Sequence, residues 1–400
     1  MKKIVLGFSG GLDTTYCLKY FTDEFNYEVH TIIVNTGGFN KNELEIIEKH
    51  AYNLGAKTHT TMDAIESYYD SIIQYLIFGN VLKNNTYPLS VSAERLSQAI
   101  HIAAHCIKIK ADMVAHGSTG AGNDQVRFDL IFNVLIPSIQ IITPIRDLKL
   151  SRQQEIDYLK NKHVQMNFEK SVYSINKGLW GTSVGGKETL HSNGQLPESA
   201  WPTPVTKEKH VDISITFNKG QLIKINEINF DHPTKAIFYL QEICSGYGIG
   251  RDIHVGDTII GIKGRVGFEA PAPLIIIKSH HQLEKHTLTK WQLNIKDQLA
   301  QFYGNWLHEG QILDPVMRNI ETFFISSQEH VTGTVFLTLK PHHFVINGIE
   351  SPFDLMNPAF GSYGEMNKTW TGEDVKGFTK IFGNQVSIYN QISKNNDAKN

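Results

Sequence analysis

The stretch "GFSGGLDTTY", Gly7–Tyr16, places two adjacent glycines, several hydroxyl side chains and one carboxylate directly after a short apolar run. Glycine allows a sharp turn and a close approach by a ligand, so successive N–H groups from Ser9 to Leu12 can converge on one anion. A helix that begins near Asp13 would add the positive end of its dipole. The stretch therefore predicts a phosphate-binding loop between a strand and a helix.

The carboxylate of Asp13 needs a separate explanation, because it would repel a phosphate group. We expect it to cap the helix or to be an indirect ligand of a Mg²⁺ ion that the nucleotide carries. The hydroxyl groups of Ser9, Thr14 and Thr15 can donate hydrogen bonds to phosphate oxygens. The loop matches neither the G-x-x-x-x-G-K-[ST] pattern nor the G-x-G-x-x-G pattern.

Strands and helices alternate over the first 165 residues. Apolar runs at Lys3–Phe8 and Val29–Val34 predict strands, and helical spacing predicts a long helix capped by Ser92. This alternation predicts an α/β fold with a doubly wound parallel sheet, in which ligands bind at the carboxyl ends of the strands. Mixed short runs after residue 170, among them expected strands at Thr258–Ile262 and Leu274–Ile277, predict an α+β second domain. We expect an ATP-binding domain at 1–165, a synthetase and multimerisation domain at 166–365, and a C-terminal helix and tail at 366–400.

The charge balance argues against several classes of partner. The 400 residues include 38 Lys and Arg against 40 Asp and Glu, a net charge of −2, which gives no general reason to bind nucleic acid or an acidic membrane. No run of 18 apolar residues is present, so we expect a cytoplasmic protein. Cys17, Cys106 and Cys244 lie far apart without a CxxC pair, which predicts neither disulfides nor zinc. The histidines around His280 are expected at the surface rather than in a metal site.

A second glycine-rich stretch, "AHGSTGAGNDQVRFDL", follows another predicted strand at Ala115–Leu130. Asn123, Asp124 and Arg127 can share one face of the helix that it enters, because residues three and four apart are neighbours. They could meet a zwitterionic ligand, with Arg127 on its carboxylate and Asp124 on its ammonium group. The alternative is a simple glycine turn with a capping Asn-Asp pair and a solvated Arg.

The first loop resembles the SGGxD[ST] motif of the PP-loop ATP pyrophosphatases, which cleave ATP between the α and β phosphates. The second closely resembles the HG-x-TGKGNDQVRFE signature of the argininosuccinate synthase family, with Ala121 and Asp129 as departures. The segments "YPLSVSAERL", "TPIRDLKLSRQQEIDYL" and "YSINKGLWGTSVGG" resemble further family segments, so the resemblance covers nearly the whole chain.

The resemblance implies a ligase that joins citrulline and aspartate through an adenylylated citrulline, releasing AMP and diphosphate, in arginine biosynthesis. It implies a homotetramer whose C-terminal tail reaches neighbouring subunits. It places ATP on Gly7, Phe8, Ser9, Gly10, Gly11, Leu12, Asp13, Thr14, Thr15, Val34 and Gly117. It places aspartate on Thr119, Asn123 and Asp124. It places citrulline on Tyr87, Ser92, Asn123, Arg127, Ser174 and Ser183. Asp13 is the candidate that acts through Mg²⁺, and Asp124 is the candidate that orients the aspartate amine or accepts its proton.

Two departures concern citrulline directly. The family's "DEN" triplet between the two citrulline serines is replaced by Asn176, Lys177 and Gly178. Gly256 and Phe268 stand where the family places a Glu and a Tyr on citrulline. Either neighbours such as Asp257 or Glu269 substitute for them, or the affinity for citrulline differs.

Two other functions remain open from the sequence. A tRNA-modifying PP-loop enzyme would need a basic face, and for thiolation a reactive cysteine pair near ATP. A catalytically silent nucleotide-binding or metabolite-sensing protein is suggested by Gly256 and Phe268. Turnover that depends on both amino acids would distinguish the synthetase from either alternative.

Overall fold

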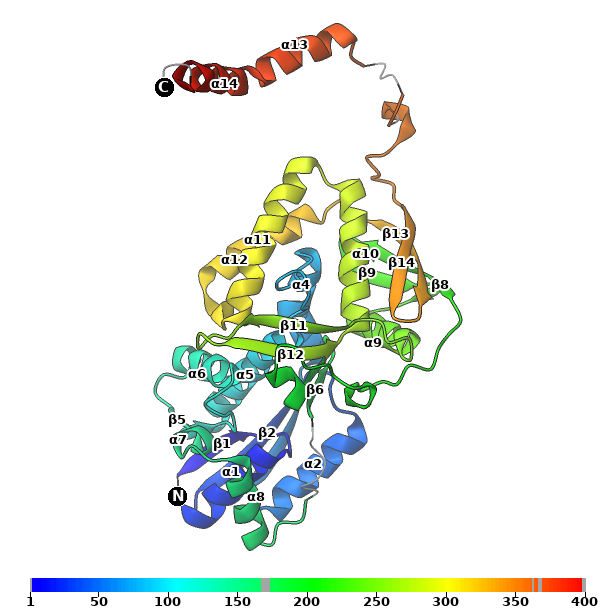
Figure 1. Ribbon diagram of the computed structural model, residues 1–400. Helices are drawn as coiled ribbons and strands as arrows, with labels where there is room; N and C mark the ends of the chain where they lie inside the picture. Colours follow the sequence, from blue (N-terminus) through cyan, green and yellow to red (C-terminus); the bar gives the residue numbers. More distant parts are fainter. Residues whose placement is uncertain (1, 167–172, 362, 366–368, 398–400) are drawn as a thin grey trace. The chain divides into compact units, whose positions relative to one another are not determined.

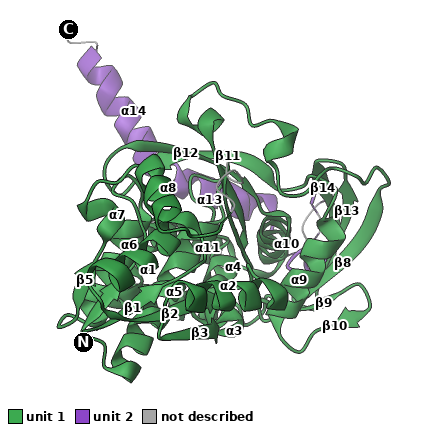
Figure 2. Cartoon of the chain, turned by 90° about the horizontal axis from the view of Figure 1, so that it is seen from below, with its two compact units in different colours: residues 1–353 green, residues 354–400 purple. Residues whose placement is uncertain are grey.

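The computed structural model describes residues 2–166, 173–361, 363–365 and 369–397. The chain forms two compact units, residues 1–353 and residues 354–400 (Figures 1 and 2). All the predicted site residues belong to the first unit.

A five-stranded parallel sheet forms the N-terminal part of the first unit and confirms the predicted doubly wound fold. Its strand order is β3-β2-β1-β4-β5. The strands are β1 (Lys3–Gly7), β2 (Glu28–Asn35), β3 (Thr58–Asp63), β4 (Met113–Ala115) and β5 (Gln140–Ile142). The order reverses between β1 and β4, which are direct parallel neighbours, with Leu6 opposite Ala115. Loops that leave these two strands border the crevice in which such sheets bind ligands.

Helices cover both faces of this sheet. Among them, α1 (Leu12–Glu24), α2 (Lys41–Asn53) and α5 (Ser90–Ile109) contact its strands. The other helices of this part are α3 (Ile65–Tyr68), the π-helical turn η1 (Tyr69–Ile73), α4 (Gln74–Phe78), α6 (Asp124–Leu135), α7 (Pro144–Asp147) and α8 (Arg152–Asn161), of which α4 packs against α10 and α12 (Figure 1). The expected cap at Ser92 is wrong, because α5 begins at Ser90 with Leu89 as the preceding residue. Ser92 lies in the first turn of α5, where its hydroxyl is free to bond to another segment.

The rest of the first unit contains two antiparallel sheets. One has the order β11-β12-β7-β6, from β6 (Ser174–Gly178), β7 (Gly181–Gly185), β11 (Arg251–Asp257) and β12 (Lys263–Glu269). The other has the order β10-β9-β8-β13-β14, from β8 (Val211–Asn218), β9 (Gln221–Ile225), β10 (Ile228–Asn229), β13 (Gly333–Lys340) and β14 (His343–Glu350). Figure 1 shows β11 and β12 between the parallel sheet and the C-terminal helices of this unit.

The helices of this second part are α9 (Pro233–Cys244), α10 (Pro271–Thr287), α11 (Lys290–His308) and α12 (Pro315–Ser327). Short 3-10 turns lie at η2 (Lys187–Leu190), η3 (Glu198–Ala200) and η4 (Gln311–Leu313), while η5 (Pro358–Phe360) belongs to the second unit. Two expected strands are wrong. Residues 258–262 form the turn between β11 and β12, and residues 274–277 lie inside α10. Ile275–Ile277 is fully or almost fully buried there, so a buried helix was mistaken for a strand.

The histidine expectation is also wrong for His280, which is fully buried on α10. Its Nδ1 lies 2.7 Å from Asn80 Oδ1 and its Nε2 lies 2.8 Å from Gln328 Oε1. Beside it, Lys296 Nζ lies 2.8 Å from Glu284 Oε2, with both side chains fully buried. These polar groups satisfy one another, as buried polar groups must.

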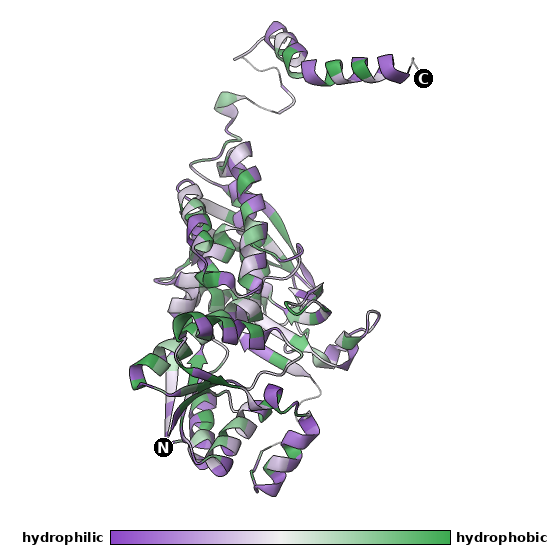
Figure 3. Ribbon diagram, turned by 90° about the vertical axis from the view of Figure 1, so that its left-hand side faces the viewer, coloured by the Kyte–Doolittle hydropathy of each residue, from purple (hydrophilic) through white to green (hydrophobic). Residues whose placement is uncertain are grey.

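The second unit contains α13 (Gly372–Phe382) and α14 (Asn384–Asp397). The polar residues up to Asp397 are helical, and residues 398–400 of the expected tail lie outside the described residues. Hydrophobic and hydrophilic residues alternate along these helices (Figure 3). Phe378 is 62% exposed and Ile381 is 78% exposed. In the described part of the chain, no helix is long and apolar enough to cross a bilayer.

Candidate active site

The phosphate loop, Ser9–Asp13, joins β1 to α1 as predicted. Gly10 has a φ of +74°, a left-handed conformation that glycine adopts without strain. Ser9 Oγ lies 3.4 Å from Thr14 Oγ1, across the turn. No side chain caps α1, so its first N–H groups are left for a ligand. The hydroxyl of Thr15 is buried and lies 3.1 Å from His50 Nε2.

Asp13 does not cap α1 and instead faces Glu155 of α8. Burial, and then the charge and hydrogen bond of Asp13, raise the pKa of Glu155 to about 8. Burial also raises the pKa of Asp13. The protonated form of Glu155 is therefore favoured beside Asp13. No pattern in the sequence indicated Glu155, because it lies on a different helix from Asp13.

The second loop, residues 116–123, adjoins the phosphate loop. A Cβ atom added to Gly117 would lie 3.2 Å from both C and Cβ of Asp13 and 3.3 Å from Cγ2 of Thr14. The two glycine turns therefore lie in contact, at the edge of the sheet where β1 and β4 end. Val34 lies buried near the end of β2, the neighbour of β1 on the other side.

Two side chains of α6 hold the second loop in shape. Gln125 Nε2 donates to the carbonyl oxygens of Gly120 and Gly122 at 2.7 and 3.2 Å. Asp129, a departure from the family signature, lies 2.9 Å from His116 Nε2 and 2.6 Å from Arg146 Nη1. Asp129 is therefore a structural anchor at the base of the loop.

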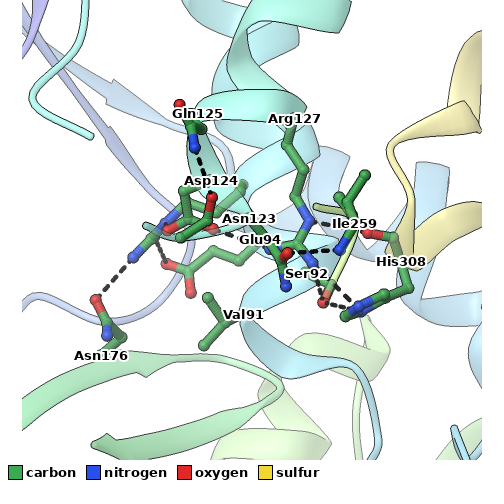
Figure 4. Close-up of polar contacts among 12 residues, drawn as sticks. Val91, Ser92, Glu94, Asn123, Asp124, Gln125, Arg127, Asn176, Ile259 and His308 are labelled. Carbon is green, nitrogen blue, oxygen red and sulfur yellow. Dashed lines mark hydrogen bonds and ion pairs between the residues drawn. The ribbon is translucent and has the colours of Figure 1, made fainter. Parts of the chain in front are cut away.

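Arg127 is the centre of a group that we call the Arg127 cluster: Ser92, Asp124, Arg127 and His308, of which Asp124 is partly exposed and the others are buried. Its Nη1 donates to Asp124 Oδ1 at 2.9 Å, its Nη2 to Ser92 Oγ at 3.0 Å, and its Nε to the carbonyl oxygen of His308 at 3.0 Å (Figure 4). Arg127 is only 3% exposed. The structure thus brings together Ser92, Asp124 and Arg127, which were predicted to bind substrates. In the structure their side chains form hydrogen bonds with one another.

Asp124 is held by a second guanidinium. Arg95 Nε donates to Asp124 Oδ2 at 3.0 Å, and Arg95 Nη2 donates to Asn176 Oδ1 at 2.7 Å. Burial opposes ionisation of Asp124, but Arg95 and Arg127 outweigh it and lower its pKa. Asn176 Nδ2 in turn lies 3.4 Å from Ser183 Oγ. The departure at Asn176 therefore lies within the site.

The β11–β12 hairpin covers the second loop. The backbone N–H of Ile259, in the hairpin turn, donates to Asn123 Oδ1 at 2.9 Å (Figure 4). The nearby β6 strand reaches the loop after β2, where Leu179 N donates to the carbonyl oxygen of Thr36 at 3.1 Å. The predicted residues Thr119 and Ser174 are both exposed, on the second loop and at the start of β6.

Tyr87 is buried beside the departures at positions 256 and 268. Its ring packs against Phe268 with centroids 5.4 Å apart and stacks on His254 at 5.1 Å. A Cβ atom added to Gly256 would lie 2.5 Å from His254 Nε2, so His254 fills the space of a side chain there. Asp257 and Glu269 were suggested as substitutes for the missing Glu and Tyr, but both form ion pairs with other residues. Asp257 lies 2.5 Å from Lys263 Nζ, and Glu269 lies 3.0 Å from Arg251 Nε.

His254 and His308 are site residues that the sequence did not indicate. Burial, then the charge of Lys83, lowers the pKa of His254 to about 4. Burial, then the charges of Arg127 and Lys83, lowers the pKa of His308 to about 3. Both rings are therefore neutral at pH 7. His308 arrives from the end of α11, 216 residues beyond Ser92, whose hydroxyl lies 3.0 Å from its Nδ1.

The described residues offer little support for the thiolation alternative. Cys17, Cys106 and Cys244 are all buried and free, and burial raises the pKa of each thiol. Thiols with raised pKa values are poor nucleophiles. Among these residues no group of three or more His, Cys, Asp or Glu side chains is placed to hold a metal ion.

The parallel sheet, the glycine turn that leads into α1 and the adjoining second loop define a nucleotide-binding domain of the PP-loop type. Residues 3–165 match the family model described as the arginosuccinate synthase N-terminal HUP domain, and residues 173–389 match that of the arginosuccinate synthase C-terminal domain. Argininosuccinate synthase of Sulfolobus acidocaldarius is 36% identical over 387 residues, covering 95% of this chain and 97% of the relative. That of Methanocaldococcus jannaschii is 34% identical over 393 residues, covering 98% of each chain. The chain belongs to the argininosuccinate synthase family.

Proposed function

We propose that the protein joins citrulline and aspartate at the expense of ATP, forming argininosuccinate, AMP and diphosphate in arginine biosynthesis. The observation that carries this proposal is the contact of the phosphate loop with the second loop at Gly117 and Asp13. A nucleotide on one side of this crevice would meet amino acids bound by α5, α6 and the β11–β12 hairpin on the other.

The ATP end of the reaction uses the phosphate loop. The proposed ligands are the residues expected from the sequence: Gly7, Phe8, Ser9, Gly10, Gly11, Leu12, Asp13, Thr14, Thr15, Val34 and Gly117. N–H groups at the start of α1 would stabilise the charge that grows on the leaving diphosphate. We propose that Mg²⁺ enters with ATP and that Asp13 acts on it indirectly, because carboxyl oxygens suit this ion.

The amino-acid end uses Tyr87, Ser92, Thr119, Asn123, Asp124, Arg127, Ser174 and Ser183. The ureido oxygen of citrulline forms a bond to the α-phosphorus of ATP while the bond to diphosphate breaks. The deprotonated amine of aspartate then bonds to the ureido carbon, and AMP leaves with the former ureido oxygen. Holding these groups in line can lower the barrier by about 7 to 11 kcal/mol in good cases.

Asp124 suits an orienting role better than proton transfer. Two guanidinium groups hold its pKa below the ordinary value, so it is a weak base near neutral pH. We therefore propose that Asp124 positions the aspartate amine and fixes Arg95 and Arg127. The side chains of the Arg127 cluster form hydrogen bonds with one another. A substrate that binds to them would therefore have to replace some of these hydrogen bonds.

Three further proposals accompany the activity: the domain boundaries at 165 and 365, a cytoplasmic location, and a homotetramer. The exposed apolar residues of α13 and α14 support assembly between copies.

The direct test is diphosphate release with ATP, citrulline and aspartate, compared with reactions that lack one amino acid. Release that requires both, with argininosuccinate formed in equal amount, supports the proposal. ATP binding without release would favour the silent nucleotide-binding protein. Modification of tRNA in place of ligation would favour the other alternative.

A further inference from the structure

A cavity of about 230 Å³ lies between the 81–85 segment and α11. Its lining includes one cation, Lys83, and four amide side chains: Asn84, Asn85, Gln301 and Asn305. None of its lining residues is acidic. Drug-sized ligands occupy cavities of roughly 300 Å³ or more, so this cavity suits a small anion or one arm of a larger ligand.

Lys83 has no carboxylate partner at ion-pair distance within the described residues. Its Nζ donates to the neutral Asn305 Oδ1 at 3.0 Å. Burial lowers the pKa of Lys83, while the charges of Glu309 and Asp257 act in the opposite direction. Asp257 is already paired with Lys263. A partly buried cation with only an amide partner is stabilised by an added anion.

The cavity borders the residues predicted for citrulline. Lys83 N donates to the carbonyl oxygen of Tyr87 at 2.8 Å, across a tight turn. Asn84 Nδ2 in the same turn donates to the carbonyl oxygen of Val255 at 3.2 Å, next to His254. The turn that supplies Lys83 and Asn84 to the cavity thus also carries Tyr87 and is bonded to β11.

The charges described near this end of the site are mixed, because Asp252 acts on His254 and Glu309 acts on Lys83. The charge of Lys83 acts on both His254 and His308, and both imidazoles are neutral at pH 7. His254 Nδ1 and His308 Nε2 are buried and bond to no other described side chain. Asp124 is committed to Arg95 and Arg127.

Orientation follows from the proposed reaction. The ureido group must face the phosphate loop, so the amino-acid end of the substrate points away from it. In Figure 1, α11 lies beyond β11 and β12 as seen from β1. The Lys83 cavity is therefore on the side that the amino-acid end would reach.

We propose that the Lys83 cavity is a carboxylate-binding subsite beside the amino-acid end of the ureido substrate. The carboxylate is carried either by an acidic acyl group on the α-nitrogen of that substrate or by a separate small dicarboxylate. An acylated α-nitrogen is uncharged and therefore needs no acidic partner in the site. This inference rests on the proposed function for the substrate's orientation.

The test compares the wild type with Lys83→Gln and Lys83→Arg. Diphosphate release is measured with ATP, aspartate and one of three ureido substrates: citrulline, its N-acetyl derivative or its N-succinyl derivative. Calorimetry with free succinate measures binding without turnover. Lys108→Gln, on the exposed face of α5, is the control for lost charge.

For the acidic arm, we expect kcat/KM for the succinylated substrate to exceed that for the acetylated one by about tenfold to hundredfold. Lys83→Gln should remove this preference, Lys83→Arg should keep part of it, and Lys108→Gln should keep it whole. Succinate binding that depends on Lys83, without a preference among substrates, supports the separate dicarboxylate. Turnover with no preference and no Lys83-dependent binding of succinate overturns the inference. Absence of turnover with every ureido substrate counts against the proposed function, and the calorimetry still decides on the cavity.

Discussion

Gly117 shows at the scale of one residue how two distant loops form one site. Its missing side chain lets the second loop touch the backbone of Asp13, about one hundred residues earlier in the chain. The close approach depends on the parallel pairing of β1 and β4, which places both loops at the same sheet edge.

We predict that Gly117→Ala weakens ATP binding. The added Cβ would lie 3.2 Å from Asp13, so the two loops must separate, and overpacking of this kind costs roughly 1 to 3 kcal/mol. The KM for ATP in diphosphate release should rise about tenfold or more.

Gly122→Ala is the matched control for this substitution. It lies in the same loop, but a Cβ there meets nothing within 4 Å. Its KM for ATP should stay within twofold of the wild type. Equal effects of the two substitutions would show that the loop contact does not matter for ATP.

Residue patterns predicted candidate site residues only where those residues lie within one short segment of the chain. The phosphate loop and the Asn123–Arg127 face were predicted because each lies within one short segment. Glu155, His254 and His308 were missed, because their roles depend on partners brought together by the fold. The family resemblance predicts that Ser92 binds citrulline. The separate prediction that Ser92 caps α5 is wrong.

Helices α1 and α8 meet through the Asp13–Glu155 pair, which gives these elements a pH dependence. Burial and Asp13 raise the pKa of Glu155 from 4.5 to about 8. The protonated form is thus favoured in the folded state. Its contribution is complete below about pH 4.5 and is lost as the pH rises through about 8.

We predict that Glu155→Gln, which mimics the protonated form, removes this dependence. Relative to the wild type, the variant should gain on the order of 2 kcal/mol in free energy of unfolding between pH 5 and pH 8. Urea denaturation across this range measures the difference. Asp157→Asn, an exposed carboxylate on the same helix, should run parallel to the wild type. If the stability of Glu155→Gln also changes with pH in parallel with the wild type, the raised pKa of Glu155 is contradicted.

Strands and helices that alternate regularly along the chain could be predicted from the sequence. Elements that are buried on most sides were harder to predict. The parallel strands of the first 165 residues carry plain apolar runs between helical repeats. In α10, Pro273 and the run Ile275–Ile277 imitate a short strand, because the helix is buried on most sides. The β11–β12 turn was missed since Ile259, Ile260 and Ile262 give it the composition of a strand.

At the scale of the whole molecule, the second unit leaves a row of apolar side chains exposed. Phe378 and Ile381 are three residues apart on α13, so they share one face. Such exposed faces usually mark contacts between proteins. The proposed homotetramer would bury them.

We predict that Ile381→Glu shifts the protein from a tetramer to smaller species. The charge would be buried without a partner in the assembly, which is costly. Light scattering after size-exclusion chromatography measures the mass. Lys380→Gln, also exposed on α13, should leave the mass unchanged. An unaltered tetramer in Ile381→Glu would mean that α13 does not hold the subunits together.

The most direct test of the proposed reaction follows one oxygen atom. Citrulline labelled with oxygen-18 in its ureido group is incubated with ATP and aspartate, and the AMP is examined by mass spectrometry. Attack of the ureido oxygen on the α-phosphorus predicts that AMP gains one labelled oxygen for each argininosuccinate formed. Argininosuccinate formed with unlabelled AMP would contradict the adenylylated intermediate and the crevice geometry on which it rests.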